Sequence, residues 1–302
     1  MAQPRLADYG MLLFLGLMWG ASFLFIDVAL ASLPPITVAA VRCLIAAVTL
    51  LAAARMMGHT LPRAPRVWLS FLTMGLTNSA IPFILISAGQ TRIDSSLAAI
   101  LIATVPLFTL VMAHLFTEDR STPRRVAGVV IGFGGIVLLI GPSAIAGVGA
   151  DLGGQLMIVG AALCYATTQV LVKRHRGGTP IVGAGCSIAC SALWTIPLAL
   201  LVEQPWRADP TTGSIVALVV LGLASTAATH FVFFLLLIRT GPQFVTLNNY
   251  IAPAVGLMLG VVFLGEIPHW TAYVALAVIV AGIAVATRTL EPRPAPLRAE
   301  AR

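Results

Sequence analysis

Ten apolar stretches follow one another along the 302-residue sequence, each of roughly the 20 residues that an α-helix needs to cross the hydrocarbon core of a bilayer. Only short polar segments separate them, and these leave no room for a soluble domain. The sequence therefore predicts an all-α polytopic membrane protein with ten transmembrane helices. The predicted spans are residues 9–31, 36–54, 67–87, 95–116, 126–140, 154–172, 181–202, 214–238, 244–264 and 270–287.

The composition agrees with this class, and the basic residues orient the chain. Hydrophobic residues make up 59% of the sequence and charged residues 10%, with a mean hydropathy of +0.98, so membrane lipid is expected to cover most of the surface. Fifteen of the 18 Lys and Arg residues lie on alternate loops and tails, against Arg92 and Arg207 on the opposite side and Arg42 within a span. The positive-inside rule then predicts that both termini lie in the cytoplasm. The membrane is expected to be a bacterial inner membrane. The net charge of +7 reflects this topology, and no nucleic-acid partner is expected.

The sequence also repeats itself internally. Pro106 and Pro253 are 147 residues apart, and a Gly-Ile pair that begins at Gly135 recurs at Gly282 with the same interval. Each copy holds five spans, and an odd number turns the second copy over in the bilayer, which is the architecture of many alternating-access carriers. The interval predicts two inverted-topology repeats within one transmembrane domain. These repeats are residues 1–143 and 144–302.

Glycines at four-residue spacing recur within the predicted spans. Because a glycine has no side chain, such pairs let two helices approach closely. We expect these glycines to pack helices within the chain rather than to form a dimer face, and we expect a monomer. The pairs are Gly16 and Gly20, Gly128 and Gly132, and Gly256 and Gly260.

Motifs of enzymatic chemistry are missing from the sequence. It contains no GxxxxGK[ST] phosphate loop, no HExxH zinc motif and no GxSxG nucleophile turn. Its five histidines are scattered, and its four cysteines fall within spans without the paired spacing of a zinc site. The sequence therefore predicts neither an enzyme nor a metal or cofactor site, and the cysteines are expected to be small buried packing residues.

Several of these features together resemble a known family. They are Trp19-Gly20 in the first span, Pro106 and Pro253 within the fourth and ninth, Glu118 and Glu266 at the ends of those spans, and the two Gly-Ile pairs. In this order, over residues 9–287, they resemble the EamA-type members of the drug/metabolite transporter superfamily, nearest to its amino-acid exporter branch. The resemblance implies a ten-helix basket around a central cavity that moves metabolites, often out of the cell.

The first and sixth spans carry matching faces with aromatic and polar residues. At an interval of 146 residues, Trp19, Ser22 and Phe23 in the first span correspond to Tyr165, Thr168 and Gln169 in the sixth, and each set occupies one helical face. Two mid-span rings could stack on an apolar or aromatic substrate side chain, while Ser22 and Gln169 hold polar atoms. Plain packing of the rings inside the bundle is the alternative.

Further polar residues lie near the middle of other spans, where a polar group needs a partner or water. Asn248, Asn249 and Tyr250 precede Pro253, whose missing amide is expected to loosen the preceding turn and present polar groups to a ligand. One asparagine could instead bond a neighbouring helix. His230, on a polar face of the eighth span, either contacts substrate or is satisfied by a neighbouring helix. The hydroxyls on that face, expected to bond carbonyls of their own helix, are Ser225, Thr226 and Thr229. The candidates from the first half are Asn78 and Thr104.

Asp27 and Arg42 are opposite charges placed inside the first helical hairpin. They lie equally far from its midpoint, so they should share a depth in the membrane and can pair. A structural salt bridge near the outer face is the first interpretation, and a charge-pair gate or a proton-linked carboxylate is the alternative. Pro106 and Pro253 are expected to let the fourth and ninth helices bend as the two halves rock.

These features predict a secondary transporter that exports small metabolites by alternating access, with neutral and aromatic amino acids as the first candidates. Export of drugs or other metabolites in the same fold, or a channel-like pore, are the alternatives. A phosphate or nucleotide-sugar substrate would call for basic residues in the cavity, where Arg42 is the one candidate. The mid-membrane region lacks a carboxylate cluster for sodium, and His230 or Asp27 would have to serve a proton, so facilitated diffusion down an outward gradient is favoured.

Overall fold

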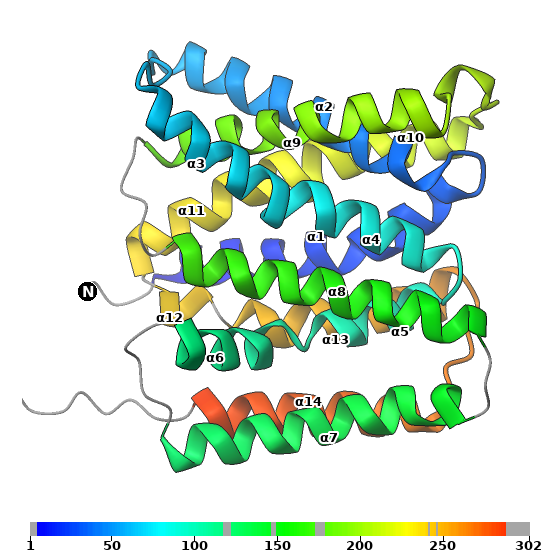
Figure 1. Ribbon diagram of the computed structural model, residues 1–302. Helices are drawn as coiled ribbons and strands as arrows, with labels where there is room; N and C mark the ends of the chain where they lie inside the picture. Colours follow the sequence, from blue (N-terminus) through cyan, green and yellow to red (C-terminus); the bar gives the residue numbers. More distant parts are fainter. Residues whose placement is uncertain are drawn as a thin grey trace, which may run out of the picture.

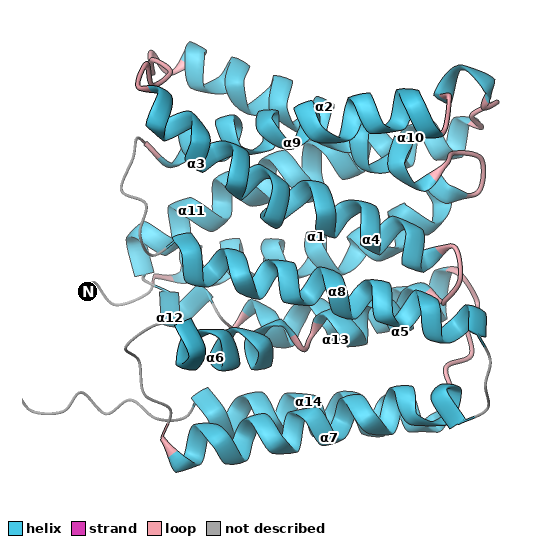
Figure 2. Ribbon diagram, in the orientation of Figure 1, coloured by secondary structure: helices cyan, strands magenta, loops and turns pink. Residues whose placement is uncertain are grey.

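The computed structural model describes residues 5–116, 122–145, 149–172, 179–240, 242–245 and 247–287, and every regular element within them is a helix (Figures 1 and 2). The two ends of the described chain, at the start of α1 (Leu6–Leu30) and the end of α14 (Trp270–Thr287), lie at the same end of the bundle, on the left in Figure 1. We call this the terminal end. The opposite end, where α1 connects to α2 (Pro35–Met56), is the distal end.

The helices follow the predicted order of spans, which confirms an all-α polytopic membrane fold. Six helical segments in the described chain are long and apolar enough to cross a membrane, and two shorter apolar helices cover Asn248–Phe263 and Trp270–Ala286. The remaining undivided spans are α7 (Pro123–Ile145), α8 (Gly149–Val172) and α9 (Pro180–Val202). The divided spans are α3 (Pro65–Gly75), η1 (Leu76–Ala80) and α4 (Ile81–Gln90); α5 (Ser95–Ile102) and α6 (Val105–Phe116); α10 (Thr212–Gly222), η3 (Leu223–Ala228) and α11 (Thr229–Thr240); and α12 (Pro242–Val245) and α13 (Asn248–Phe263). A short helix η2 (Pro205–Arg207) lies between α9 and α10.

Local sequence explains where several helices begin. The first residue of α2, α3, α7 and α9 is a proline. A proline at this position leaves no N–H unsatisfied, and its fixed φ already suits a helix. α10 begins after Thr211, whose hydroxyl accepts a hydrogen bond from the amide of Ser214 at 3.2 Å. These helix starts are therefore built into the chain before any tertiary contact forms.

Helices that are far apart in sequence pack closely through glycine. α2 packs along α9, α1 along α13, and α7 along α14, and the last pair lies side by side in Figure 1. A β-carbon on Gly128 would lie 2.6 Å from the carbonyl oxygen of Gly282, and one on Gly20 would lie 2.6 Å from that of Ala252. A β-carbon on Gly256 would lie 2.5 Å from the β-carbon of Ala99. These glycines pack helices within the chain, as predicted.

Two π-helical turns, which the sequence did not predict, interrupt the third and eighth spans at matching places. η1 and η3 begin 147 residues apart, the interval of the sequence repeat. Each follows a glycine that is pressed against a helix of the other half. A β-carbon on Gly75 would lie 2.6 Å from the carbonyl oxygen of Ser187 on α9, and one on Gly222 would lie 2.5 Å from Cγ2 of Ile45 on α2. π-helical turns are rare and frequently occur at functional sites.

The fourth span, predicted as continuous, is broken directly before its proline. α5 ends at Ile102, two residues form a turn, and α6 begins at Val105 with Pro106 as its second residue. The proline ring clashes with the backbone of a preceding helical turn and removes one of its hydrogen bonds, so the helix restarts at the proline instead of running through it. The hydroxyl of Thr104, in the turn, donates to the carbonyl oxygen of Leu101 at 2.6 Å.

Candidate functional site

The polar centre of the bundle is organised around Arg42 on α2. Its side chain is buried, and its Nε donates a hydrogen bond to Oγ1 of Thr226 on η3 at 2.6 Å. Its guanidinium carbon lies 3.9 Å from the centroid of the Phe83 ring on α4, within the range of a cation–π interaction. Arg42 therefore contacts an element from each half of the chain.

The expected pairing of Arg42 with Asp27 is not formed, and that interpretation was wrong. Arg42 uses Thr226 and Phe83, whereas Asp27 is half-buried near the distal end of α1, and the charged groups that act on it are the carboxylates of Glu266 and Asp94. Equal depth in a hairpin fixes how far two side chains lie from the membrane surface, but it does not fix the direction in which each points. A gating or proton-binding role for either residue stays a prediction.

Thr226 on η3 both donates and accepts a hydrogen bond. The hydroxyl of Thr226 donates to the carbonyl oxygen of Leu221, five residues earlier, at 2.7 Å, so its oxygen remains available to accept from Arg42. The hydroxyl of Thr229 donates to the carbonyl oxygen of Ser225, four residues earlier, at 2.8 Å. Thr229 thus makes the expected bond to the carbonyl four residues earlier and Thr226 makes one to the carbonyl five residues earlier, whereas Oγ of Ser225 has no hydrogen-bond partner within the described residues. Nothing in the sequence indicated that Thr226 also contacts an arginine.

Two of the predicted substrate residues lie beside Arg42. His230 and Tyr165 are half-buried and within electrostatic reach of the guanidinium. Nδ1 of His230 lies 2.8 Å from the carbonyl oxygen of Thr226, and because a carbonyl only accepts, Nδ1 carries the proton. His230 is thus satisfied by its own helix rather than by a neighbouring one. We call the group formed by Arg42, Phe83, Tyr165, Thr226 and His230 the Arg42 cluster.

Trp19 and Ser22 are placed in a second group, on α1. The Trp19 ring lies 5.7 Å from that of Phe233 on α11, and it packs beside a buried cluster that includes Leu15 and Leu236. The hydroxyl of Ser22 is buried and donates to the carbonyl oxygen of Trp19 at 2.6 Å. In this conformation Trp19 makes the packing contacts that were the alternative to substrate stacking, and a role for either residue in binding stays a prediction.

Asn248, Asn249 and Tyr250 form the first turn of α13, and they do not form the loosened turn that was expected before Pro253. Pro253 lies inside α13, which begins only one turn earlier, so little helix precedes the proline and few hydrogen bonds are lost there. Asn248 is buried against Gly16, and its Oδ1 has no hydrogen-bond partner within the described residues. Asn249 and Tyr250 are half-buried, and Tyr250 packs against the core.

Hydroxyl and amide groups of η1, α6 and α8 form a third group. Thr168 donates to Oγ1 of Thr77 at 2.8 Å, and Thr109 donates to Oε1 of the exposed Gln169 at 3.3 Å. Asn78, half-buried, follows Thr77 on η1. Gln169 and Asn78 were predicted from the sequence. Thr77 and Thr109 were not, because threonine is common on helix surfaces and carries no signal there.

Thr104 and the two prolines differ from the other candidates in their surroundings. Thr104 is fully enclosed at the break between α5 and α6, so it is not accessible to a ligand in this conformation. Pro106 marks that break, whereas Pro253 is part of an uninterrupted α13. Helix bending at either proline stays a prediction. Glu118, which contributed to the resemblance, lies outside the described residues.

Comparison with known proteins identifies the family. The model of the EamA-like transporter family matches residues 8–141 and again residues 152–288. The chain belongs to the EamA-like transporter family. The family assignment also agrees with the ten-span arrangement, and the family model matches each half of the chain once.

Relatives of this EamA-like transporter are membrane transporters at low sequence identity. The protein described as the uncharacterized inner membrane transporter YedA of Escherichia coli K12 is 26% identical over 280 residues, covering 92% of this chain and 90% of the relative. A protein of Streptantibioticus cattleyicolor described as a probable terminal-alkyne amino-acid exporter is 26% identical over 277 residues, covering 89% and 90% of the two chains. A crystal structure at 22% identity superposes with a TM-score of 0.66 over 94% of this chain and 98% of that one, which supports the fold alone.

Two glutamates join separate helices at the distal end of this EamA-like transporter. Glu203, directly after α9, accepts hydrogen bonds from the amides of Ile36 and Thr37 at 2.9 and 2.7 Å, at the start of α2. Glu266, between α13 and α14, accepts from the amides of Ser95 and Ser96 at 2.7 and 2.9 Å, at the start of α5. A carboxylate at a helix N-terminus satisfies amides that lack partners and complements the helix dipole. The sequence located Glu266 but gave no indication of this contact.

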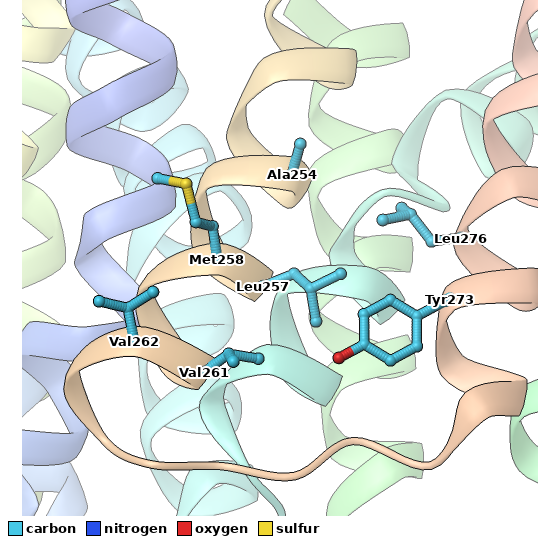
Figure 3. Close-up of a pocket in the computed structure, with 7 residues that line it drawn as sticks. All are labelled: Ala254, Leu257, Met258, Val261, Val262, Tyr273 and Leu276. Carbon is cyan, nitrogen blue, oxygen red and sulfur yellow. The ribbon is translucent and has the colours of Figure 1, made fainter.

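A cavity of about 290 Å³ between α13 and α14 is a separate feature (Figure 3). Leu257 and Val261 on α13 face Tyr273 and Leu276 on α14, and the lining contains almost no polar surface. Met258 and Tyr273 are exposed at the surface of the helix bundle. The cavity contains none of the predicted substrate residues, and its apolar, exposed lining fits contact with lipid tails.

Proposed function

We propose that this EamA-like transporter is a secondary carrier that exports small amphipathic metabolites by alternating access, with neutral and aromatic amino acids as the first candidate substrates. It works in the bacterial inner membrane with both termini in the cytoplasm, which makes the terminal end the cytoplasmic face. Its partners are a small-molecule substrate and membrane lipid, without nucleic acid, and the carrier acts as a monomer.

The observation that carries this proposal is that the two π-helical turns, η1 and η3, lie at matching positions in the two halves of the chain. Both π-helical turns lie within a span, at the interval that relates the two halves, and both follow a glycine pressed against the other half. η3 carries Thr226 of the Arg42 cluster, and η1 carries Asn78. Helices bend at π-helical turns. Each half therefore has a place to bend beside a polar group, which is what a carrier needs to open on either side of a central site.

The chemistry of the polar groups supports an amphipathic substrate. The Arg42 cluster combines one cation and one imidazole with the rings of Phe83 and Tyr165, which suits a molecule with a polar end and an apolar body. The relative described as a probable terminal-alkyne amino-acid exporter transports a compound of this kind, by its description. In the described chain, the spans carry no cluster of carboxylates beside Arg42 that would hold sodium, so we favour facilitated diffusion down an outward gradient.

Counterflow in proteoliposomes tests the proposal. Vesicles that contain the purified protein are loaded with unlabelled amino acid and then exposed to labelled phenylalanine, threonine or methionine, with and without a pH gradient. Saturable accumulation of label above that of empty liposomes, unchanged by the gradient, is expected for facilitated diffusion. A response to the gradient would establish proton coupling in its place.

The same assay separates the alternatives. Flux that rises linearly with substrate concentration and shows no counterflow would indicate a channel-like pore. No accumulation of any of the three amino acids would contradict the amino-acid proposal and favour a drug or another metabolite as the substrate.

A further inference from the structure

We propose that the guanidinium of Arg42 binds a carboxylate of the transported molecule, so that this carrier selects small monocarboxylates with an apolar body over the matching amides and amines. The inference rests on the proposed function and makes it more specific, because it names the chemical group that the central site recognises.

The charge of Arg42 has no protein counter-ion in the part of the chain that the structure describes. Its side chain is only 5% exposed, and its contacts are a neutral hydroxyl and an aromatic ring. The titratable groups that most affect it are Tyr165 and Cys43, which are neutral at physiological pH. Burying an unpaired charge is costly, and buried charges in proteins are normally paired. A ligand that carries a negative charge would supply the missing pair.

The contacts of Arg42 also leave the binding edge of its guanidinium unused. A guanidinium has five N–H donors, and the hydrogen bond to Thr226 uses the one on Nε. Within the described residues, neither terminal nitrogen takes part in a hydrogen bond. These two nitrogens form the fork that holds both oxygens of a carboxylate in parallel hydrogen bonds.

The neighbours of Arg42 hold this fork in place. Nε is fixed by Thr226, and the flat face of the guanidinium lies against Phe83. A side chain held on its inner edge and on one face loses less freedom when a ligand binds, which strengthens binding. Tyr165, which packs against both large core clusters, places an apolar surface near the same point for the body of the substrate.

A purely structural role is the competing explanation. Arg42 connects α2 to η3, so it could hold these elements together while water fills the space at its fork. Loss of Arg42 would then lower the yield and transport of all substrates alike. A substrate site predicts something different, a loss of discrimination between a carboxylate and its uncharged analogue.

The test compares ligands that differ only at the carboxyl group. Binding to the purified protein in nanodiscs is measured as the rise in thermal unfolding temperature with ligand concentration. The pairs are 3-phenylpropionate with 3-phenylpropionamide, and phenylalanine with phenylalaninamide. For the wild-type protein, we expect at least one acid to bind about tenfold or more tightly than its amide, the effect of a charge-assisted bidentate contact.

Variants then assign the preference to Arg42. Arg42→Gln should reduce the ratio of acid to amide affinity to within about twofold, while Arg42→Lys, which keeps a charge without the fork, should keep an intermediate ratio. Arg207→Gln removes an exposed arginine at the distal end and serves as the matched control, with the wild-type ratio expected. If Arg42→Gln does not fold, the wild-type and Arg42→Lys ratios decide the question.

The outcomes separate this inference from the proposed function. Equal binding of acid and amide to the wild-type protein, no binding of any acid, or an unchanged ratio in Arg42→Gln would overturn the role of Arg42, even if amino-acid counterflow is observed. Selective binding of 3-phenylpropionate that depends on Arg42, without amino-acid counterflow, would support the carboxylate site and contradict amino acids as substrates.

Discussion

At the scale of single residues, one hydroxyl links the intramembrane arginine to the rest of the bundle. Thr226 donates to Leu221 and accepts from Arg42 at 2.6 Å, so it connects a π-helical turn of one half with a charge of the other. Both side chains are buried. Removing the hydroxyl therefore leaves a buried charged donor without its partner, which is more costly than the loss of an ordinary hydrogen bond.

We predict that Thr226→Val, which keeps the shape of the side chain, destabilises the protein by about 1–3 kcal/mol. The free energy of unfolding in detergent, measured by denaturant titration, checks this value. Thr229→Val is the matched control in the same span. The Thr229 hydroxyl bonds only carbonyl oxygens of its own helix, at Ser225 and Thr226, so its loss should cost less. Equal costs for the two variants would contradict the importance of the contact with Arg42.

Arg42 also indicates which properties of a site the sequence can predict. Its depth could be predicted, because position along a span sets distance from the membrane surface at about 1.5 Å per residue. Its direction could not, because successive residues turn by about 100° and the neighbour met at each angle depends on tertiary packing. The sequence therefore selected Arg42, His230 and Tyr165 as site residues, but it paired Arg42 with Asp27 and missed Phe83.

At the scale of elements, α7 and α14 approach each other closely where glycines meet. A β-carbon on Gly128 would lie 2.5 Å from the amide nitrogen of Ala286 and 2.6 Å from the carbonyl oxygen of Gly282. These are backbone atoms, so they cannot rotate away as the end of a side chain can. The helices would have to move apart along their length.

We predict that Gly128→Ala lowers stability by about 1–3 kcal/mol through this clash. Gly134→Ala on the same helix is the control, since a β-carbon there meets nothing within 4 Å and should change stability by no more than about 1 kcal/mol. Thermal unfolding of both variants in the same detergent measures the difference. If Gly128→Ala were as stable as Gly134→Ala, α7 and α14 would not be held at the distance described.

The helices themselves were mostly predictable, whereas the two π-helical interruptions were not. An apolar stretch in lipid must satisfy its backbone internally, so length and hydropathy alone predict a helix. The break before Pro106 also has a local cause in the proline ring. The π-helical turns η1 and η3 have no comparable signature, because ordinary residues form them and each lies where a glycine contacts the other half.

At the scale of the whole molecule, carboxylates hold the distal end together across the two halves. Glu203 from the second half caps α2 of the first, and Glu266 from the second half caps α5 of the first. Ser32 of the α1–α2 connection adds a hydrogen bond to Ser214 of α10 at 2.8 Å. In a carrier that opens to each side in turn, contacts between the halves at one end must break when that end opens. In the alternating-access mechanism that we propose, these caps favour the conformation that is closed at the distal end.

We predict that Glu266→Gln shifts the carrier toward opening at the distal end. The amide keeps a neutral acceptor but loses the charge-assisted bonds to Ser95 and Ser96, a loss of about 1–2 kcal/mol and hence a five- to thirtyfold rise in the open population. The reporter is Asn78→Cys in a background without the four native cysteines, labelled from the distal side with a membrane-impermeant maleimide. Asp209→Asn, an exposed carboxylate of the same end, is the control and should label as slowly as the parent. Unchanged labelling in Glu266→Gln, or an equal increase in Asp209→Asn, would show that this cap does not hold the distal end closed.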